Sequence, residues 1–361
     1  MILKITDRFE NRQIEFFNNF NFTLQHDSVG STFSFDFFFD PDNPDHKELA
    51  CVSHYHECTM EDNGELLLTG FIISQGFEVR ENKQLAKFSG YSKPGVLEDC
   101  QIPPDIYPLQ SDGLTLRQIA EKLIRPFKLK LIVDDSVAAR VDKVFPKSTA
   151  SETQTIKDYL HGLCKQKNIV ISHDEKGNLL FTESKTKQAP ILEFDLSTGS
   201  IPGMKFNFDF NGQAMHSHIT LQKQASSEGG NAGEYTIRNP YVLVVYRPCV
   251  RTQSSGDDND TSLAARRELS KELENLKWTI EMDRWHVDEK IVKPINIFTL
   301  ISPELYGYVK VRLFIKSINF VGDPSKQTAT LNCVLPEVFD NEIPVSIFKG
   351  INTVPRHVPS I

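Results

Sequence analysis

The sequence predicts an α+β protein, mainly β, in which an α/β part separates two antiparallel β parts. Three observations predict this class: apolar and polar residues alternate in the first ninety-odd residues, two stretches with helical apolar stripes follow, and alternation returns after about residue 190. The 361 residues exceed one ordinary domain. We expect a first β part at 1–95, an α/β part at 96–189, a second β part at 190–342 and a C-terminal tail at 343–361.

The first β part is indicated by its phenylalanines. Every odd position of Phe33–Phe39 is aromatic, and two of the three even positions are polar, which is the period of a half-buried strand. Phe20, Phe22 and Leu24 repeat the pattern one strand earlier. We expect these phenylalanines to form the core of the first β part.

A turn and further strands complete the first β part. Asn63 and Gly64 tolerate a positive φ, so they predict a hairpin turn between strands at 54–60 and 65–74. Further extended runs, at 71–79 and 85–91, imply a small antiparallel sheet or barrel.

The α/β part is indicated by two helices that alternate with short strands. Thr115 can cap the first helix, which Pro126 ends before a strand at 129–133. The second helix is expected from about Ser151, before strands at 169–172 and 179–182. The apolar stripes are Leu116, Ile119, Ala120 and Leu123 in the first helix and Ile156, Leu160, Leu163 and Cys164 in the second.

The second β part is expected to carry exposed loops and a helix. Polar segments at 226–231 and 254–260 predict the loops. Thr261 is a good cap for a helix with Ala265, Leu269, Leu273 and Leu276 at helical spacing. Strands are expected at 278–282, 309–315 and 329–335, with a turn at 323–325.

Composition excludes several functional classes. The net charge of −8 argues against a nonspecific nucleic-acid binder, which would rely on an excess of basic residues. Residues 1–95 hold 8 basic and 15 acidic side chains, so almost all the net charge lies there. The N-terminus meets charge too early for a signal peptide, and no window is apolar enough for a membrane span, so we expect cytosol-like conditions.

Cysteine and histidine residues give the most tempting candidate site. Cys51, His54, His56 and Cys58 lie within eight residues and offer ligands that suit zinc. On a strand, however, Cys51 would point away from the other three, and zinc would need a sharp turn there. We favour an ordinary strand face and leave a metal site as the alternative. The six cysteines contain no C-x-x-C pair, which argues against a disulfide framework or a zinc ribbon.

Other candidate residues have simpler interpretations. His161 and Cys164 lie one helical turn apart, but Cys164 also fits the apolar stripe and is interpreted as a buried structural thiol. His216 and His218 have no nearby partner in sequence, and the acidic run 257–260 lacks the glycine and the distal glutamate of an EF-hand. Motifs for nucleotide binding, serine hydrolysis and zinc proteolysis are absent, so we assign no catalytic, cofactor-binding or metal residues.

Two stretches carry a resemblance to a known family. The run Gly90–Cys100 (GYSKPGVLEDC), then 114–120 (LTLRQIA), a helix at 156–160 and a hairpin ending at 177–181, is similar to the middle of the baseplate hub proteins of contractile-tailed phages, of the Mu-like and late-control-D groups. The second stretch runs from Tyr246–Pro248 through 264–268, 278–285, 297–302 and 309–320 to 328–336. It resembles the second barrel of these hubs.

The resemblance implies a fold and a function. The fold would be two tube-protein-like antiparallel β-barrels with an intervening α/β domain. Three copies would form a ring that joins the hexameric tail tube to the trimeric central spike and leaves a channel for DNA passage. The partners would be two further copies, the spike, the tail tube protein and other baseplate proteins, with no sequence-specific nucleic-acid binding. The protein would act in the virion tail baseplate after assembly in the host cytoplasm, without enzymatic activity.

Two points stay open at this level. If the acidic side chains of the first barrel face the channel, three copies would repel DNA phosphates and let the genome slide through. The alternative function is a cell-wall-degrading or carbohydrate-binding β protein of the tail, for which acidic residues from distant strands would have to converge in a cleft.

Overall fold

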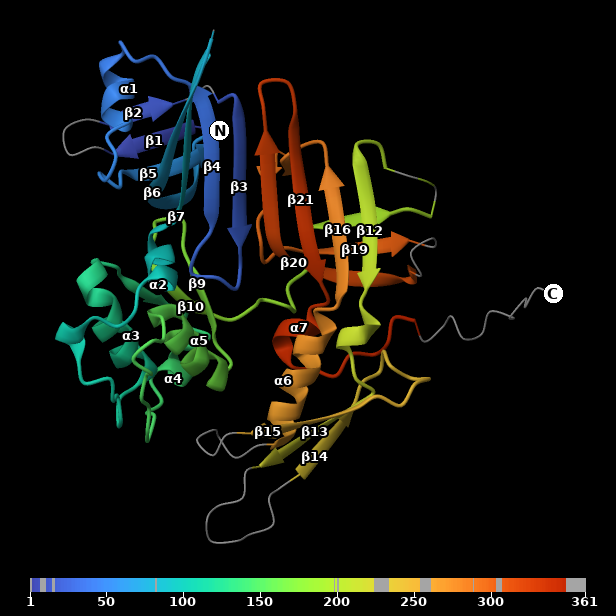
Figure 1. The fold of residues 1–361 in the computed structure, drawn as a ribbon. Coiled ribbons are helices and arrows are strands. Elements are labelled where there is room, and N and C mark those ends of the chain that lie inside the picture. The colour runs from blue at the N-terminus through green and yellow to red at the C-terminus, as the bar shows by residue number, and fades with distance from the viewer. Residues whose placement is uncertain are drawn as a thin grey trace. The chain divides into compact units, whose positions relative to one another are not determined.

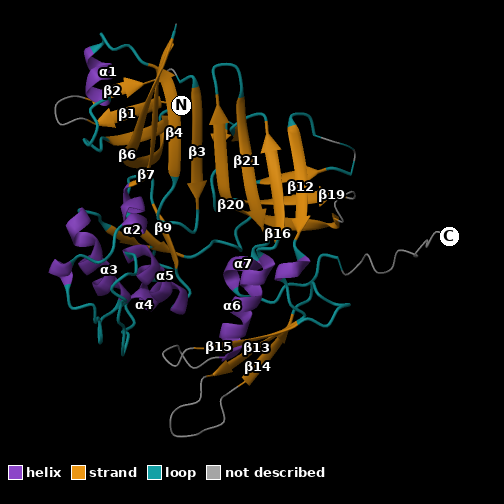
Figure 2. Ribbon diagram, in the orientation of Figure 1, coloured by secondary structure: helices purple, strands orange, loops and turns teal. Residues whose placement is uncertain are grey.

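The computed structural model describes residues 2–6, 11–14, 17–81, 83–197, 199, 201–223, 234–253, 261–287, 289–302 and 307–348. Strands account for 42% and helices for 21%, which confirms the α+β, mainly β class with antiparallel sheets (Figure 2). Among the described residues, no helix is long and apolar enough to cross a membrane.

The described residues divide between two compact units. Unit 1 comprises those within Met1–Glu183, Asp283–Ile291 and Ser317–Ala329. Unit 2 comprises those within Ser184–Met282, Val292–Lys316 and Thr330–Ile361. Each unit is therefore assembled from three separate stretches of the chain.

Unit 1 begins with an antiparallel sheet, drawn in blue in Figure 1. Its strands follow the order β2-β1-β5-β6-β7-β4-β3, and residues 317–322 of β20 pair with β3. The elements are β1 (Ile2–Thr6), β2 (Asn11–Ile14), β3 (Asn19–Gln25), β4 (Thr32–Phe38), α1 (Pro44–Leu49), β5 (Glu57–Asp62), β6 (Glu65–Arg80), β7 (Lys83–Ser92) and β20 (Gly307–Gly322), with a small pair β17 (His286–Val287) and β18 (Lys290–Ile291).

The core of this sheet is aromatic, as its alternation predicts. In β4, Phe33, Phe35 and Phe37 are buried while Ser34 is exposed. The ring of Phe35 stacks on that of Phe88 in β7 with centroids 5.5 Å apart. The buried face of β3 continues the core, where Phe22 stacks on Phe320 at 5.9 Å. Long-range strand pairing thus brings together rings that lie about three hundred residues apart in the sequence.

The predicted hairpin at Asn63–Gly64 is confirmed, since both residues have a positive φ, 49° and 82°. Two strand boundaries were wrong. The strand expected from His54 begins only at Glu57, because Ser53 and Tyr55 have φ values of 72° and 47° that break the extended backbone. The strands expected at 65–74 and 71–79 form one strand, β6, whose pairing shifts by one residue near Ile72 without ending it.

The α/β layer of unit 1 packs its helices against a three-stranded sheet of order β8-β10-β9. Its elements are η1 (Lys93–Gly95), α2 (Val96–Asp99), η2 (Pro104–Ile106), α3 (Leu116–Ile124), η3 (Arg125–Phe127), β8 (Leu131–Val133), α4 (Ala138–Val141), α5 (Ile156–Gln166), β9 (Val170–His173) and β10 (Leu179–Thr182). The stripe residues predicted for both helices are buried.

Capping determines where the two main helices begin. The Thr115 hydroxyl accepts a hydrogen bond from the Gln118 amide, and the Gln118 side chain accepts one from the Thr115 amide, which is a capping box. The second helix was expected to begin near Ser151, but Thr155 caps it by accepting from the Asp158 amide at 3.1 Å. The residues before Thr155 form a turn, since the Gln154 amide donates to the Ser151 carbonyl.

Unit 2 contains a sheet in which β12-β16-β21-β20 are adjacent, with β19 beside β20 and β11 beside β19. A second sheet, of order β14-β13-β15, packs against α6. The elements are β11 (Leu192–Asp195), β12 (Met204–Phe210), η4 (Gly212–Ala214), β13 (His218–Lys223), β14 (Glu234–Arg238), β15 (Pro248–Gln253), α6 (Thr261–Leu273), β16 (Leu276–Met282), β19 (Ile297–Ser302), β21 (Gln327–Val334) and α7 (Glu337–Asp340), together with β20.

The predictions for unit 2 are largely confirmed. Ala265, Leu269 and Leu273 of α6 are buried, and β16 shows the expected alternation with Trp278, Ile280 and Met282 buried. Leu276 opens β16 and is not on the helix. The loops expected at 226–231 and 254–260 lie outside the described residues. Thr261, expected as the cap, is the first residue of α6 itself.

Two strands are shared between the units. Residues 307–316 of β20 belong to unit 2 and residues 317–322 to unit 1, while β21 changes unit after Ala329. Each of these strands therefore contributes residues to both units.

Candidate functional site

The structure separates the four residues that the sequence grouped as a possible metal site. Cys58 lies in β5 with no exposed surface, and burial raises the pKa of its thiol far above the ordinary value. A protonated, buried thiol is a poor metal ligand, because metals bind the thiolate. His56 is only 5% exposed, and its carbonyl accepts a hydrogen bond from the Ile72 amide of β6 at 2.9 Å.

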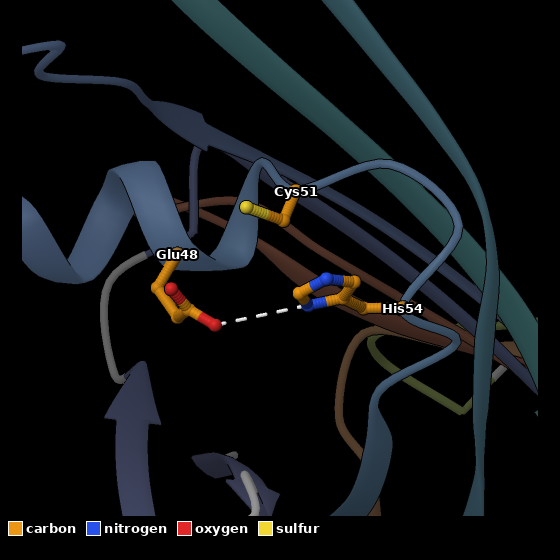
Figure 3. Close-up of side chains that lie close together, drawn as sticks. All are labelled: Glu48, Cys51 and His54. Atoms are coloured by element: carbon orange, nitrogen blue, oxygen red, sulfur yellow. Dashed lines mark ion pairs between the residues drawn. The ribbon is translucent and has the colours of Figure 1, made fainter.

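Cys51 and His54 meet a partner that the sequence reasoning missed. Donor atoms of Glu48, Cys51 and His54 all lie within 4.8 Å of one another (Figure 3). The Glu48 Oε1 to His54 Nδ1 distance is 3.7 Å. The sequence analysis did not include Glu48 in the candidate site, because it precedes the Cys/His run and belongs to a short helix, α1, that the sequence pattern did not predict. Its three-residue spacing from Cys51 was the available signal.

His161 and Cys164 do not form a reactive pair. Cys164 is fully buried in the stripe of α5, and burial raises the pKa of its thiol far above the ordinary value. His161 points to solvent on the same helix. The interpretation of Cys164 as a structural thiol fits this placement.

The histidines near β13 have partners that are distant in sequence. His216 Nδ1 lies 2.7 Å from Oε1 of Glu272, a carboxylate in α6 that is only 4% exposed. The His216 amide also donates to the other oxygen of Glu272 at 2.8 Å. Because the pair joins residues 56 positions apart, no local pattern could reveal it. Among the described contacts, this buried pair tethers α6 to the start of β13.

Ser217 does not complete a serine-type triad with these groups. Its hydroxyl lies 2.9 Å from Nδ1 of His218, whereas the carboxylate of Glu272 contacts the other imidazole, that of His216. The Ser217 oxygen also accepts a hydrogen bond from the Arg247 amide. A catalytic triad requires one imidazole to bridge the hydroxyl and the acid. The described geometry is therefore that of a structural network.

An open groove of about 460 Å³ lies on the sheet of unit 1. Asn21, Ser34 and Asp36 line it and alternate with the buried phenylalanines, so they occupy the other face of β3 and β4. Asp36 pairs in register with Lys87 of β7, which also lines the groove. The lining offers amides, hydroxyls and one carboxylate beside one ammonium, which can hydrogen-bond a ligand but supplies no pair of carboxylates.

Exposed apolar side chains are consecutive in one segment of unit 2. Leu243, Val244, Val245 and Tyr246 are consecutive and are 46%, 95%, 59% and 76% exposed. Val250 in β15 is 60% exposed as well. Contiguous apolar surface of this kind usually marks a protein interface. We name Leu243–Tyr246 the apolar segment.

The Gly90–Cys100 run, which carries the family resemblance, occupies the junction between β7 and α2. A Cβ atom on Gly90 would lie 1.9 Å from the Phe71 carbonyl oxygen, so no side chain fits there. Ser92 is fully buried, and its hydroxyl accepts from the Ser31 amide and donates to the Val29 carbonyl. The Tyr91 hydroxyl donates to Asp99 at 2.8 Å. These residues serve the fold of the junction.

A model of a known protein family matches the segment that begins at this junction. Residues 94–183 match the family model described as the second domain of gp44-like baseplate hub proteins. A search of curated proteins finds no match to the chain.

Solved structures with the same fold span most of the chain. The 43 kDa tail protein of prophage MuSo2 from Shewanella oneidensis is similar with a TM-score of 0.77 and 19% identity, over 94% of this chain and all of that one. The tail protein from Neisseria meningitidis MC58 has a TM-score of 0.74 and 15% identity, over 94% and 98% of the two chains. The E. coli c3393 protein, a component of the type VI secretion system, has a TM-score of 0.54 and 9% identity, over 92% and 76%. The chain thus has the fold of these phage tail proteins, and its residues 94–183 match the second domain of gp44-like baseplate hub proteins.

Proposed function

We propose that the protein is the structural hub of a contractile phage tail baseplate. Three copies form a ring that joins the hexameric tail tube to the trimeric central spike and leaves a channel for DNA. One observation carries the proposal: a domain of the baseplate hub family lies within a chain whose fold matches a phage tail protein over that protein's entire length. The match to a secretion-system component extends the same fold to a second kind of injection particle.

The proposal assigns the parts of the chain and the partners. The first tube-like barrel is residues 1–95, the α/β domain 96–189, the second barrel 190–342 and the tail 343–361. The family match at 94–183 supports the limits of the α/β domain. The partners are two further copies, the spike protein, the tail tube protein and other baseplate proteins. The protein acts in the virion baseplate after assembly in the host cytoplasm, and it is not an enzyme.

The apolar segment supports a subunit contact. Four consecutive apolar side chains with about half or more of their surface in water are costly unless a partner covers them. A ring of identical subunits repeats one contact at every interface and covers such a surface three times. We assign the apolar segment to a contact within the baseplate.

The charge of the channel wall has a direct test. Residues 1–95 carry 15 acidic and 8 basic side chains, which would repel DNA phosphates if they face the channel. In the sheet, by contrast, Lys87 lies opposite Asp36 in register and forms an ion pair with Glu78 at 3.1 Å, which offsets part of this acidity. A map of the surface charge in a purified ring decides between an acidic wall and a neutral one, and a neutral or basic wall would contradict DNA repulsion by these residues.

The function is tested by the mass and shape of the full-length protein in solution. Light scattering coupled to size-exclusion chromatography is expected to give three times the 41.1 kDa chain mass. Electron microscopy is expected to show a ring with an open centre. A monomer that hydrolyses peptidoglycan, or that binds glycans without forming a ring, would support the cell-wall protein instead. The Val244→Asp variant, which places a charge in the apolar segment, is expected to weaken the trimer. Val79→Asp, at a valine of unit 1 that is 77% exposed against 95% for Val244, serves as the control.

A further inference from the structure

The loop between α1 and β5 gathers three side chains whose chemistry suits one metal ion. Glu48, Cys51 and His54 offer a carboxylate oxygen, a sulfur and an imidazole nitrogen, and these atoms lie within 4.8 Å of one another (Figure 3). In a tetrahedral zinc site, with bonds of about 2.0–2.3 Å, the ligand atoms lie about 3.3–3.8 Å apart. The Glu48 to His54 distance of 3.7 Å already falls in this range.

The local backbone holds the three donors on one side of the loop. Glu48 lies in the last turn of α1, and the Cys51 amide donates to the Glu48 carbonyl at 3.0 Å, which places the two side chains one turn apart. Ser53, with a φ of 72°, then reverses the chain so that His54 returns to the end of the helix. A zinc site in this run needs a sharp turn, and the structure has one at Ser53.

Both ends of the loop are anchored to the sheet. The Gln75 side chain in β6 donates to the Leu49 carbonyl at 2.9 Å, and the Ile72 amide donates to the His56 carbonyl. A donor set that is held before the ion arrives loses less entropy on binding than one that must be ordered. The side chains of Glu48 and His54 are 37% and 51% exposed, so an ion can reach them from solvent.

A buried nitrogen next to the cluster adds a second observation. His56 is 5% exposed, and its Nε2 has no hydrogen-bond partner among the described residues. Its ring packs edge-on against that of His54, with centroids 5.5 Å apart. A buried polar atom without a partner often marks a place where a water or an ion is bound. Because the two rings are in contact, a movement of His54 toward an ion would change the environment of the His56 ring.

We propose that Glu48, Cys51 and His54 bind one zinc ion, with the fourth position open to water or to a partner's side chain. Sulfur and imidazole ligands favour zinc and disfavour calcium and magnesium, which take oxygen ligands. The ion would fix a loop that exposes Val52 and Tyr55, 66% and 62% exposed, as a rigid apolar surface. This site is independent of the proposed baseplate function, since it depends only on the local geometry of unit 1.

The test uses the full-length protein, reduced and stripped of metal, titrated with cobalt and then with zinc. A cobalt–thiolate charge-transfer band that saturates at one ion per chain and disappears on addition of zinc is expected. Cys51→Ser should abolish the band and weaken zinc binding more than about 100-fold, since even outer partners of a metal contribute about 10–100-fold. Cys249→Ser, which removes another partly exposed thiol in unit 2, should change neither.

Three results would overturn the proposal: no saturable binding by the wild-type protein, undiminished binding by Cys51→Ser, or loss of the band in Cys249→Ser alone. Circular dichroism checks the fold of each variant. If Cys51→Ser does not fold, His54→Gln replaces it, because that side chain is half exposed and its substitution leaves the core intact. Undiminished zinc affinity in His54→Gln would then also contradict the site.

Discussion

The sheet and the α/β layer of unit 1 bury their apolar surfaces in different ways. The core of the sheet is built from stacked aromatic rings, such as Phe35 on Phe88, that long-range strand pairing brings together. The core of the α/β layer is largely aliphatic and lies between helices and strands that are close in sequence. The first core depends on pairing across the whole chain, whereas the second depends on local caps and stripes.

Because of this difference, we expect the two regions to lose different amounts of stability when a core side chain is truncated. A large ring in a close-packed sheet leaves a large cavity when it is removed, and neighbouring rings cannot easily collapse into it. Aliphatic side chains between helices are smaller, and a helix can shift slightly to compensate. The sheet should therefore be the more sensitive region.

Truncation of a core phenylalanine should have the largest effect. Phe22 has no exposed surface and stacks on Phe320, so Phe22→Ala is expected to lower the free energy of unfolding by about 3–5 kcal/mol. Urea denaturation measures it. Phe38→Ala, at a position on β4 that is 55% exposed, is the matched control and should cost well under half as much. Equal losses would show that the aromatic face does not control stability.

A core leucine of the α/β layer should come next. Leu160 in α5 is fully buried, and Leu160→Ala is expected to cost about 2–5 kcal/mol, less than the change at Phe22. The same denaturation experiment gives the value, with Ile132→Ala in β8, 42% exposed, as the control. If Leu160→Ala proved the more damaging of the two core variants, the comparison between sheet and layer would be reversed.

Loss of a helix cap should have a smaller effect that is confined to the α/β layer. Thr115→Ala removes the hydroxyl of the capping box of α3 and should cost about 1 kcal/mol. Thr115→Ser keeps a hydroxyl and should restore most of the loss. Hydrogen exchange of the first amides of α3 locates the effect, and unchanged exchange in Thr115→Ala would mean that the cap does not hold this helix end.

The pH dependence should be the smallest effect. Burial lowers the pKa of His173 below its usual 6.5, and its Nε2 lies 2.7 Å from the Ser31 hydroxyl. Since the unfolded chain takes up this proton at a higher pH than the folded one, stability is retained above about pH 6.5 and is lost as the pH falls toward the lowered pKa. Unfolding measured between about pH 7.5 and about pH 5.5 should show a shallower decline in His173→Gln. If stability declined equally steeply with pH in His173→Gln and in the wild-type protein, His173 would not be the source of the decline.

Local features of the sequence predicted much of the fold. The alternation in β4, the turn at Asn63 and the cap at Thr115 each depend on a few adjacent residues, and each was predicted correctly. The pairing of β3 with β20 could not be predicted, because the alternation of a strand marks its buried face but not its neighbour. The short helix α1 was missed because its six residues span fewer than two turns and bury one apolar side chain, Leu49, so no apolar stripe repeats.

In the candidate sites, too, local placements could be predicted and contacts between distant residues could not. The placement of Cys164 was predictable from the stripe of its own helix. The partnership of His216 with Glu272 was not, since it joins residues from separate elements. The positive φ values of Ser53 and Tyr55 interrupt the extended backbone between Cys51 and Cys58. The sequence did not predict them, because serine and tyrosine rarely adopt a positive φ. Expected absences of catalytic and cofactor residues stay predictions.

The sharing of β20 and β21 between the units has a consequence for inheritance. The chain passes from one unit to the other after Glu183, Met282, Ile291, Lys316 and Ala329. Neither unit can therefore be encoded by a single uninterrupted stretch of gene. A recombination event that replaced one unit with a foreign version would have to exchange three segments at once, and two of the new junctions, after Lys316 and Ala329, would lie within strands. We therefore expect this protein to vary mainly by substitution of single residues and rarely by exchange of a whole unit.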